Sequence, residues 1–259
     1  MDSGATGSAG GRLAGTRPNA LRLRLIRESL AALFEGGVDT TGLLGQALYD
    51  LYHSCEPEAF FVCNEQEERQ LDLHFYLTPQ PDSLEAALLT HVVGRCLDIG
   101  CGAGRILRYL SAKGCAVVGI DIDPPLIQLC RELGDSPVHV TSWEKMEPLG
   151  QFDSLLLLNR SIGIGGNLAG VKRLLARCAA SASSRGVLLF DSYEVAGPTG
   201  VLERTLRYKY RGQYGEAFPW VYFCSEIANQ LLAEAGWVSD TVICEGDRYG
   251  VVARRDLKA

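Results

Sequence analysis

The spacing of apolar positions changes near residue 83. Before that point apolar residues recur every three or four positions, which is typical of amphipathic helices. Thr78-Pro79 and Pro81 interrupt this pattern, because proline lacks a backbone N–H and does not continue a helix. The first 18 residues, rich in Gly, Ala and Ser, predict a flexible tail. The segment 19–82 predicts a helical lead-in, with helices at 21–34, 43–52 and 65–76.

From Ser83 onward, short apolar runs alternate with helix-like segments. A near-continuous run such as 152–158 is typical of a strand covered on both faces. Strands that alternate with helices predict a parallel sheet with right-handed crossovers, the doubly wound α/β class. The expected strands cover 95–99, 116–121, 138–141, 152–158 and 186–191, and the expected helices cover 83–92 (capped by Ser83), 105–113, 124–133 and 168–182. We therefore predict one domain over 83–259.

The alternation lapses between residues 193 and 224, a stretch rich in aromatic and basic residues. It holds one strand-like segment, 205–211, in which tyrosines alternate with cations, so that the two kinds face opposite ways. We expect an insertion that lies over the sheet as a lid or acceptor wall. The alternative is an exposed basic strand whose aromatics face the sheet. A helix at 225–235 and a hairpin of 238–244 with 249–254 close the domain.

The composition of the chain disfavours several classes of function. The chain has 25 basic and 31 acidic residues and a net charge of −6, which disfavours a dedicated nucleic-acid partner. The apolar runs are strand-sized, which predicts no membrane span. The nine cysteines are scattered, without the two-residue spacing of a zinc or redox motif. We therefore expect no metal site, reduced thiols and a cytoplasmic location.

The strongest chemical signal is a glycine loop between the first strand and the following helix, Asp98-Ile99-Gly100-Cys101-Gly102-Ala103-Gly104-Arg105. Glycines let a backbone approach a ligand closely at a helix N-terminus. The competing motif is the dinucleotide fingerprint G-x-G-x-x-G, whose third glycine would fall at Arg105. The observed spacing, with Asp98 before the first glycine, fits a compact ligand without a pyrophosphate better.

A second acid, Asp121, ends the next strand. A carboxylate at that strand end can accept both hydroxyls of a ribose, whichever nucleoside is bound. The order strand, glycine loop, helix, strand and acid therefore predicts a nucleoside-containing ligand at the carboxyl ends of the first two strands.

These motifs resemble the class I S-adenosylmethionine-dependent methyltransferases, over roughly 83–191 by motif and over the closing hairpin by topology. The resemblance implies a seven-stranded sheet in the order 3-2-1-4-5-7-6 with the seventh strand antiparallel, and S-adenosylmethionine as cofactor. It places Ile122 on the adenine and Ser142-Trp143 along the adenine edge, and sets Asn159 by the methionine amino group. The cofactor residues that it implies are Asp98, Gly100, Cys101, Gly102, Gly104, Asp121, Ile122, Ser142, Trp143 and Asn159.

The expected function is methyl transfer to an oxygen or nitrogen of a small molecule, with secondary metabolism as a possible setting. The fourth strand ends in Leu158-Asn159-Arg160-Ser161, which lacks the Asn/Asp-Pro-Pro-Tyr/Phe signature of nucleic-acid amino methylation. Two alternatives stay open, a non-catalytic cofactor-binding or regulatory protein and an NAD(P)-dependent oxidoreductase. Transfer of a different group from the same sulfonium also stays open.

The acceptor site is less well defined by the sequence. A protonated acceptor needs a general base, and the chain has four histidines. His53 and His74 lie in the lead-in, which in this family commonly forms part of the acceptor pocket, so they are the candidate bases. Candidate acceptor contacts are Tyr76, Arg160, Arg207, Trp220 and Tyr222. Helix packing would explain Tyr76 equally well.

Overall fold

The computed structural model describes residues 42–54, 58–145 and 149–256, all within the compact unit Thr40–Ala259. The expected tail and the expected helix at 21–34 lie outside the described residues. The described residues contain two β-sheets, one of seven strands and one of five. No helix among them is long and apolar enough to cross a membrane.

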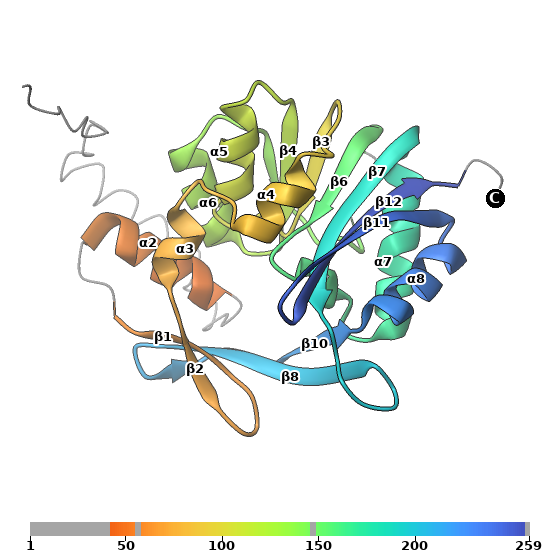
Figure 1. The fold of residues 1–259 in the computed structure, drawn as a ribbon. Helices are drawn as coiled ribbons and strands as arrows, with labels where there is room; N and C mark the ends of the chain where they lie inside the picture. The colour runs from red at the N-terminus through yellow and green to blue at the C-terminus, as the bar shows by residue number, and fades with distance from the viewer. Residues whose placement is uncertain (1–41, 55–57, 146–148, 257–259) are drawn as a thin grey trace, which may run out of the picture. The chain divides into compact units, whose positions relative to one another are not determined.

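The seven-stranded sheet has the order β11-β12-β7-β6-β3-β4-β5 (Figure 1). Its first five strands in the chain pair in parallel, whereas β12 runs antiparallel to both of its neighbours. Numbered along the chain from β3, the order is 3-2-1-4-5-7-6, a doubly wound α/β sheet. The strands are β3 (Cys96–Ile99), β4 (Val117–Asp121), β5 (Val138–Val140), β6 (Phe152–Leu157), β7 (Ala182–Tyr193), β11 (Trp237–Glu245) and β12 (Arg248–Arg255).

Helices cover both faces of this sheet. Along β6 successive side chains enter opposite layers, so that Leu155 and Leu157 pack with α7 and α8 while Leu156 packs with α4 and α5. This double burial explains why the central strands are apolar without interruption. The helices are α4 (Ser83–Leu89), α5 (Arg105–Ser111), α6 (Pro124–Leu133), α7 (Leu168–Ser181) and α8 (Ser225–Glu234).

Side-chain caps define where the helices begin. Asp82, and not the expected Ser83, caps α4: its carboxylate accepts from the N–H of Glu85 at 2.9 Å, and Glu85 reaches back to the N–H of Asp82. Asp123 caps α6, and Pro124 takes the first helical position, where its missing N–H costs no hydrogen bond. The Asp123 carboxylate also accepts from the N–H of Gly45 in α2 (Leu43–Ser54), at 3.3 Å.

The structure contains a second sheet where the sequence predicts part of a helical lead-in. The predicted helix at 65–76 is wrong: this segment is largely a strand followed by a short helix, and an unpredicted strand precedes it. The sheet has the order β10-β8-β1-β2, with β9 paired to β8. Its elements are β1 (Phe60–Cys63), β2 (Glu68–Leu71), β8 (Val201–Tyr210), β9 (Gln213–Tyr214) and β10 (Phe218–Phe223), and the short helix is α3 (Leu73–Leu77).

The hairpin of β1 and β2 forms because β8 pairs with it from the other end of the chain. Phe60 lies opposite Tyr210, and Val62 lies opposite Tyr208. The expected insertion at 193–224 therefore contains three strands and not one. Figure 1 shows this second sheet lying across one end of the seven-stranded sheet.

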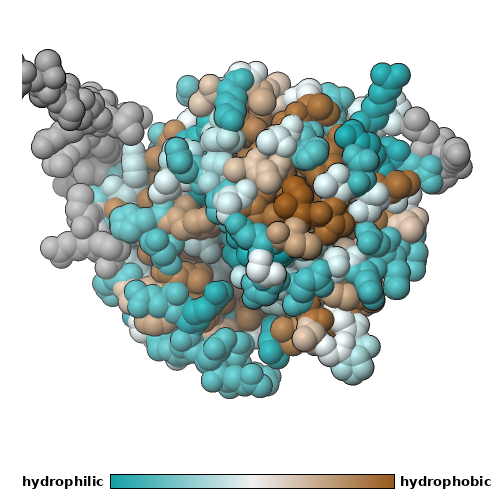
Figure 2. Space-filling model, in the orientation of Figure 1, coloured by the Kyte–Doolittle hydropathy of each residue, from teal (hydrophilic) through white to brown (hydrophobic). Residues whose placement is uncertain are grey.

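The two faces of the second sheet differ in chemistry, as the alternation of tyrosines and cations predicts. On its inner face Phe60 and Tyr210 are buried with α2 and α6. On its outer face Lys209 pairs with Glu68 at 2.6 Å, and Arg211, just past β8, pairs with Glu58 at 3.0 Å. Hydrophilic residues accordingly predominate in the lower part of Figure 2, where Figure 1 draws the second sheet.

A buried ion pair links α4 to the start of α5. The Arg105 guanidinium bonds both carboxylate oxygens of Glu85, and both side chains are almost fully buried. Arg105 also donates to the carbonyl of Gln80 at 2.7 Å and lies 4.3 Å from the ring centre of Phe75 in α3. One side chain thus holds the segment before α4 against the helix that follows β3.

Glu85→Gln is expected to lower the free energy of unfolding by about 3–5 kcal/mol, because it leaves the Arg105 charge buried without its counter-ion. Urea denaturation measures the change. Lys172→Ala is the control, since Lys172 and Glu234 form an ion pair in which both side chains are more than half exposed; it should change stability by under about 1 kcal/mol. Equal effects of the two substitutions would contradict a structural role for the buried pair.

Candidate functional site

The glycine loop connects β3 to α5 through three residues in the left-handed region. Gly100, Gly102 and Gly104 have φ of 78°, 55° and 75°. A side chain at Gly104 would meet the Cys130 sulfur at 2.3 Å, whereas the corresponding direction at Gly102 is open space. The loop therefore requires glycine for its backbone, and at Gly102 it leaves room for a ligand to approach. Cys101 turns its side chain into the core, so only its backbone can face a ligand.

Asp121 ties the glycine loop to the end of β4. Its carboxylate accepts from the N–H of Gly102 at 2.9 Å and from the N–H of Asp123 at 3.0 Å. The neighbouring Ile122 is 62% exposed although it is large and apolar. An acid and an open apolar surface side by side suit the ribose and the base of a nucleoside.

Asp98, at the end of β3, is buried beneath the loop. Burial raises the pKa of its carboxyl to about 7; the Arg105 cation opposes the rise, and the charges of Glu85 and Asp121 add to it. A buried carboxyl that titrates near neutrality is poised to pair with a cationic group of a ligand.

Ser142 and Trp143 follow β5 at the same edge of the sheet. The N–H of Thr141 donates to the Asp121 carbonyl at 2.9 Å, which ties this segment to the end of β4. Ser142 accepts from the N–H of Lys145 at 3.3 Å, and Trp143 packs partly against the central core. This segment therefore lies beside the end of β4, and the place of Ser142 and Trp143 along an adenine edge stays a prediction.

Asn159 and Arg160, after β6, are consecutive non-glycine residues with φ of 54° and 64°. The Arg160 N–H donates to the buried Asp191 carboxylate at 3.0 Å, and its guanidinium donates to the Tyr193 hydroxyl at 3.0 Å and to Asn159. Left-handed backbone at such residues costs about 1–3 kcal/mol each and concentrates at functional sites. We therefore count this turn among the candidate site residues.

Three tyrosines from three elements lie around Arg160, and a fourth, Tyr208, lies near two of them. We call this group, Tyr76 of α3, Tyr193 of β7, Tyr208 of β8 and Tyr222 of β10, the tyrosine cluster. The rings of Tyr193 and Tyr222 are 5.5 Å apart, and Arg160 lies 5.4 Å from the Tyr193 ring centre. The Asn159 side chain opposes the rise in the pKa of Tyr76, so α3 lies close to the turn after β6.

Burial raises the pKa of Tyr76, Tyr208 and Tyr222, so their hydroxyls are protonated donors at neutral pH. The charge of Asp121 adds to the rise at Tyr208. Tyr208 thus lies near the acid at the end of β4, and the tyrosine cluster borders the glycine-loop site.

Two further predicted acceptor contacts have different outcomes. Trp220 packs against Gly163, in the 3₁₀ turn Ser161–Gly165 that follows Arg160, and its indole N–H is buried without a hydrogen-bond partner in the described structure. Arg207 is not brought to the site. It is exposed on the outer face of the second sheet, with its guanidinium 5.8 Å from the Tyr214 ring centre, because it alternates with the inward Tyr208.

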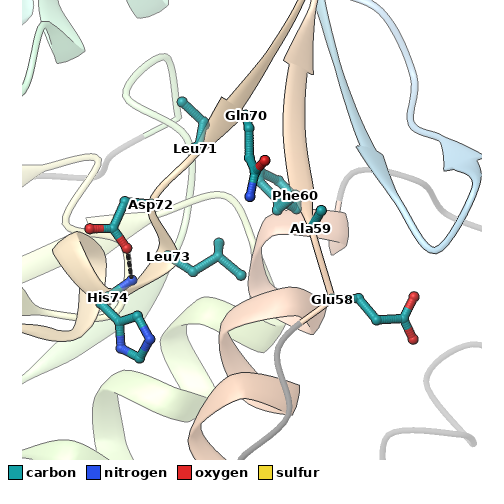
Figure 3. Close-up of a pocket in the computed structure, with 8 residues that line it drawn as sticks. All are labelled: Glu58, Ala59, Phe60, Gln70, Leu71, Asp72, Leu73 and His74. Carbon is teal, nitrogen blue, oxygen red and sulfur yellow. Dashed lines mark hydrogen bonds between the residues drawn. The ribbon is translucent and has the colours of Figure 1, made fainter.

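The structure does not bring the two predicted histidine bases to the site. His53 hydrogen-bonds Glu132 at 3.1 Å. Glu132 lies nine residues along α6 from Asp123, so about 13 Å of helix separates this contact from the start of α6. His74 is exposed and lies two residues before Tyr76 in α3, so the two side chains point about 200° apart. It lines a separate pocket of about 440 Å³ at the base of the β1–β2 hairpin, where its N–H is held by Asp72 (Figure 3).

Comparison with known proteins agrees with this geometry. The model of the family described as methyltransferase domain matches residues 97–190. Residues 97–190 therefore form a methyltransferase domain. The structure of an S-adenosylmethionine-dependent methyltransferase from Bacteroides fragilis, in complex with S-adenosyl-L-homocysteine, has a TM-score of 0.77 and 24% identity, covering 85% of this chain and 97% of that one. At that identity the likeness shows the shared fold.

Curated relatives match the methyltransferase domain over part of their length. A ubiquinone biosynthesis O-methyltransferase of Bradyrhizobium diazoefficiens is 30% identical over 103 residues, 38% of this chain and 39% of that protein. A 2-heptyl-1-hydroxyquinolin-4(1H)-one methyltransferase of Mycobacteroides abscessus is 30% identical over 146 residues, 50% of this chain and 62% of that protein. The chain thus spans about two fifths of the first relative and three fifths of the second.

Asp121→Ala is expected to weaken binding of S-adenosylhomocysteine by about 1–3 kcal/mol, because the ribose loses its acceptor and the loop loses its bond to Gly102. Isothermal titration calorimetry measures the change. Asp240→Ala is the control, since the exposed Asp240 pairs with the exposed Arg254 across β11 and β12. An unchanged affinity in Asp121→Ala would refute the assignment.

The titration of Asp98 predicts a pH dependence. A ligand ammonium group beside Asp98 favours the ionised carboxylate, so binding requires the loss of a proton whose pKa in the free protein is about 7. Affinity for S-adenosylhomocysteine should therefore fall as pH drops below 7, by up to about tenfold per unit. Asp98→Asn should bind more weakly at pH 8 and show a flat profile between pH 5.5 and 8. A sloping profile in that variant would assign the titration to another group.

Proposed function

We propose that this protein transfers the methyl group of S-adenosylmethionine to an oxygen or nitrogen of a small molecule. The observation that carries the proposal is the meeting of two sets of residues at the carboxyl ends of the central strands. One set is the glycine loop with Asp98, Asp121 and Ile122; the other is the tyrosine cluster. A cofactor held by the first set would present its reactive end toward the second.

The residues at the loop fit the cofactor. The open direction at Gly102 allows close approach, Asp121 offers carboxylate oxygens to a ribose, and exposed Ile122 offers an apolar surface to a base. Asp98 would face the ammonium of the methionine part. S-adenosylmethionine supplies an already activated methyl group on a sulfonium, so the protein chiefly has to align the acceptor and exclude water.

The tyrosine cluster would align the acceptor. Its hydroxyls are donors, and its rings suit a planar acceptor, in keeping with the quinolinone named for one relative. None of the four histidines lies in the cluster: His53 bonds Glu132, His74 and His139 are exposed, and His91 follows α4. We infer that the acceptor reacts as an ionised oxygen or a neutral amine, for which no histidine base is required.

The proposal is favoured over its two rivals. Dinucleotide binding through G-x-G-x-x-G needs a third glycine for close helix packing, and this position is the buried Arg105, which makes an ion pair. A purely cofactor-binding role would leave the strained turn at Asn159 and Arg160 and the convergent tyrosines without a purpose. The proposal includes secondary metabolism as the setting in which the small molecule is methylated.

Calorimetric titration with S-adenosylmethionine, S-adenosylhomocysteine and NAD⁺ tests the proposed function. Micromolar binding of the first two without NAD⁺ is expected, followed by transfer of label from methyl-labelled S-adenosylmethionine to members of a phenol and amine panel. Binding of NAD⁺ alone would move the chemistry to hydride transfer. Binding of the sulfonium cofactor without turnover on any panel member would favour the non-catalytic alternative.

A further inference from the structure

Arg69 of β2 faces the site from the second sheet. The strand register places Val62 opposite both Arg69 and Tyr208. Directly opposed residues in antiparallel strands project from the same face, so Arg69 shares the inner face with Tyr208. The sequence pattern concealed this position, because 65–76 reads as a helix.

The charge of Arg69 acts on the tyrosine cluster. It lowers the pKa of Tyr76 and of Tyr222, against the larger effect of burial, and Arg160 acts on the same two hydroxyls. Two cations from opposite sides, one on β2 and one after β6, thus lie close to the two tyrosine hydroxyls.

Among the described residues no carboxylate pairs with Arg69, and the carboxylate that acts on Arg160 is shared with another arginine. The buried Asp191 accepts from the Arg160 N–H and pairs with Arg248 at 3.1 Å. Glu68, next to Arg69, projects from the outer face, where it binds Lys209 and Tyr214. Within the described structure Arg69 makes no ion pair or hydrogen bond, whereas the outer-face cations Lys209 and Arg211 each bind a carboxylate.

We infer that Arg69 binds an anionic group of the acceptor, a carboxylate or a phosphate on an aromatic ring. This inference rests on the proposed function and names its substrate class. A guanidinium presents its donors in a planar fork that matches the two oxygens of such a group. Arg69 is therefore a specificity-determining residue: it selects acidic acceptors, and the tyrosines hold the ring.

Paired ligands that differ in one charge test the inference. The protein, saturated with S-adenosylhomocysteine, is titrated with 4-hydroxybenzoate, 4-hydroxyphenyl phosphate and the neutral 4-hydroxybenzamide. At least one of the two acids is expected to bind at least tenfold more tightly than the amide, and the tighter acid identifies the carboxylate or the phosphate. Arg69→Gln should remove this preference without weakening the amide, and Arg69→Lys should restore part of it.

Arg207→Gln is the matched control, because Arg207 lies on the same sheet but on its outer face. It should keep the preference for the acid. The inference is overturned if neither acid binds the wild-type protein more tightly than the amide does, which includes the case that no acid binds up to 10 mM. It is also overturned if Arg207→Gln reduces the preference for the acid as strongly as Arg69→Gln does. S-adenosylhomocysteine alone should bind Arg69→Gln as it binds the wild type. If S-adenosylhomocysteine failed to bind the wild-type protein, that result would instead contradict the proposed function.

Discussion

The buried contact between Arg105 and Glu85 holds the two halves of the site together. Arg105 begins α5 directly after the glycine loop, and its guanidinium reaches α4, the Gln80 carbonyl and the ring of Phe75. Tyr76 follows Phe75, so the residue that ends the glycine loop also positions the first member of the tyrosine cluster. The same cation lies near Asp98 and opposes the rise of its pKa. The Arg105 cation thus influences both the cofactor residues and the acceptor residues.

The central domain could be predicted because its signals are local. Apolar runs, glycines at fixed spacing and an acid at a strand end depend on a few neighbouring residues, and they located β3 to β7, the glycine loop and Asp121. The second sheet could not be predicted in the same way. β1 and β2 are each four residues long, and β1 pairs on its other side with β8, which lies far along the chain. Tertiary pairing therefore overrode the helix-like spacing of 65–76.

On the acceptor side of the site, local sequence signals were likewise insufficient to predict the position of single residues. Alternation along β8 indicated that tyrosines and cations face opposite ways, and this is how Tyr208 and Lys209 lie. Which face points toward the site depends on strand register, and the register places Arg69 on the inner face and Arg207 on the outer face. The prediction of His53 and His74 as bases rests on imidazole chemistry and on their place in the lead-in, and neither fixes where a side chain points. His53 instead forms a hydrogen bond with Glu132 that links α2 to α6, a role that no local pattern reveals.

The pairing of β1 with β8 also constrains how the chain is made. Phe60 leaves the ribosome long before Tyr210, its partner, and at about 5–20 residues per second the interval is on the order of ten seconds. During that time the early hairpin has an unpaired edge and an uncovered apolar face, which are the features that promote association with other chains. The central strands from β3 to β7 emerge in between and can fold first. The pairing of the second sheet is therefore completed only after β8 emerges, and nascent chains that stall before residue 201 would present that edge to chaperones.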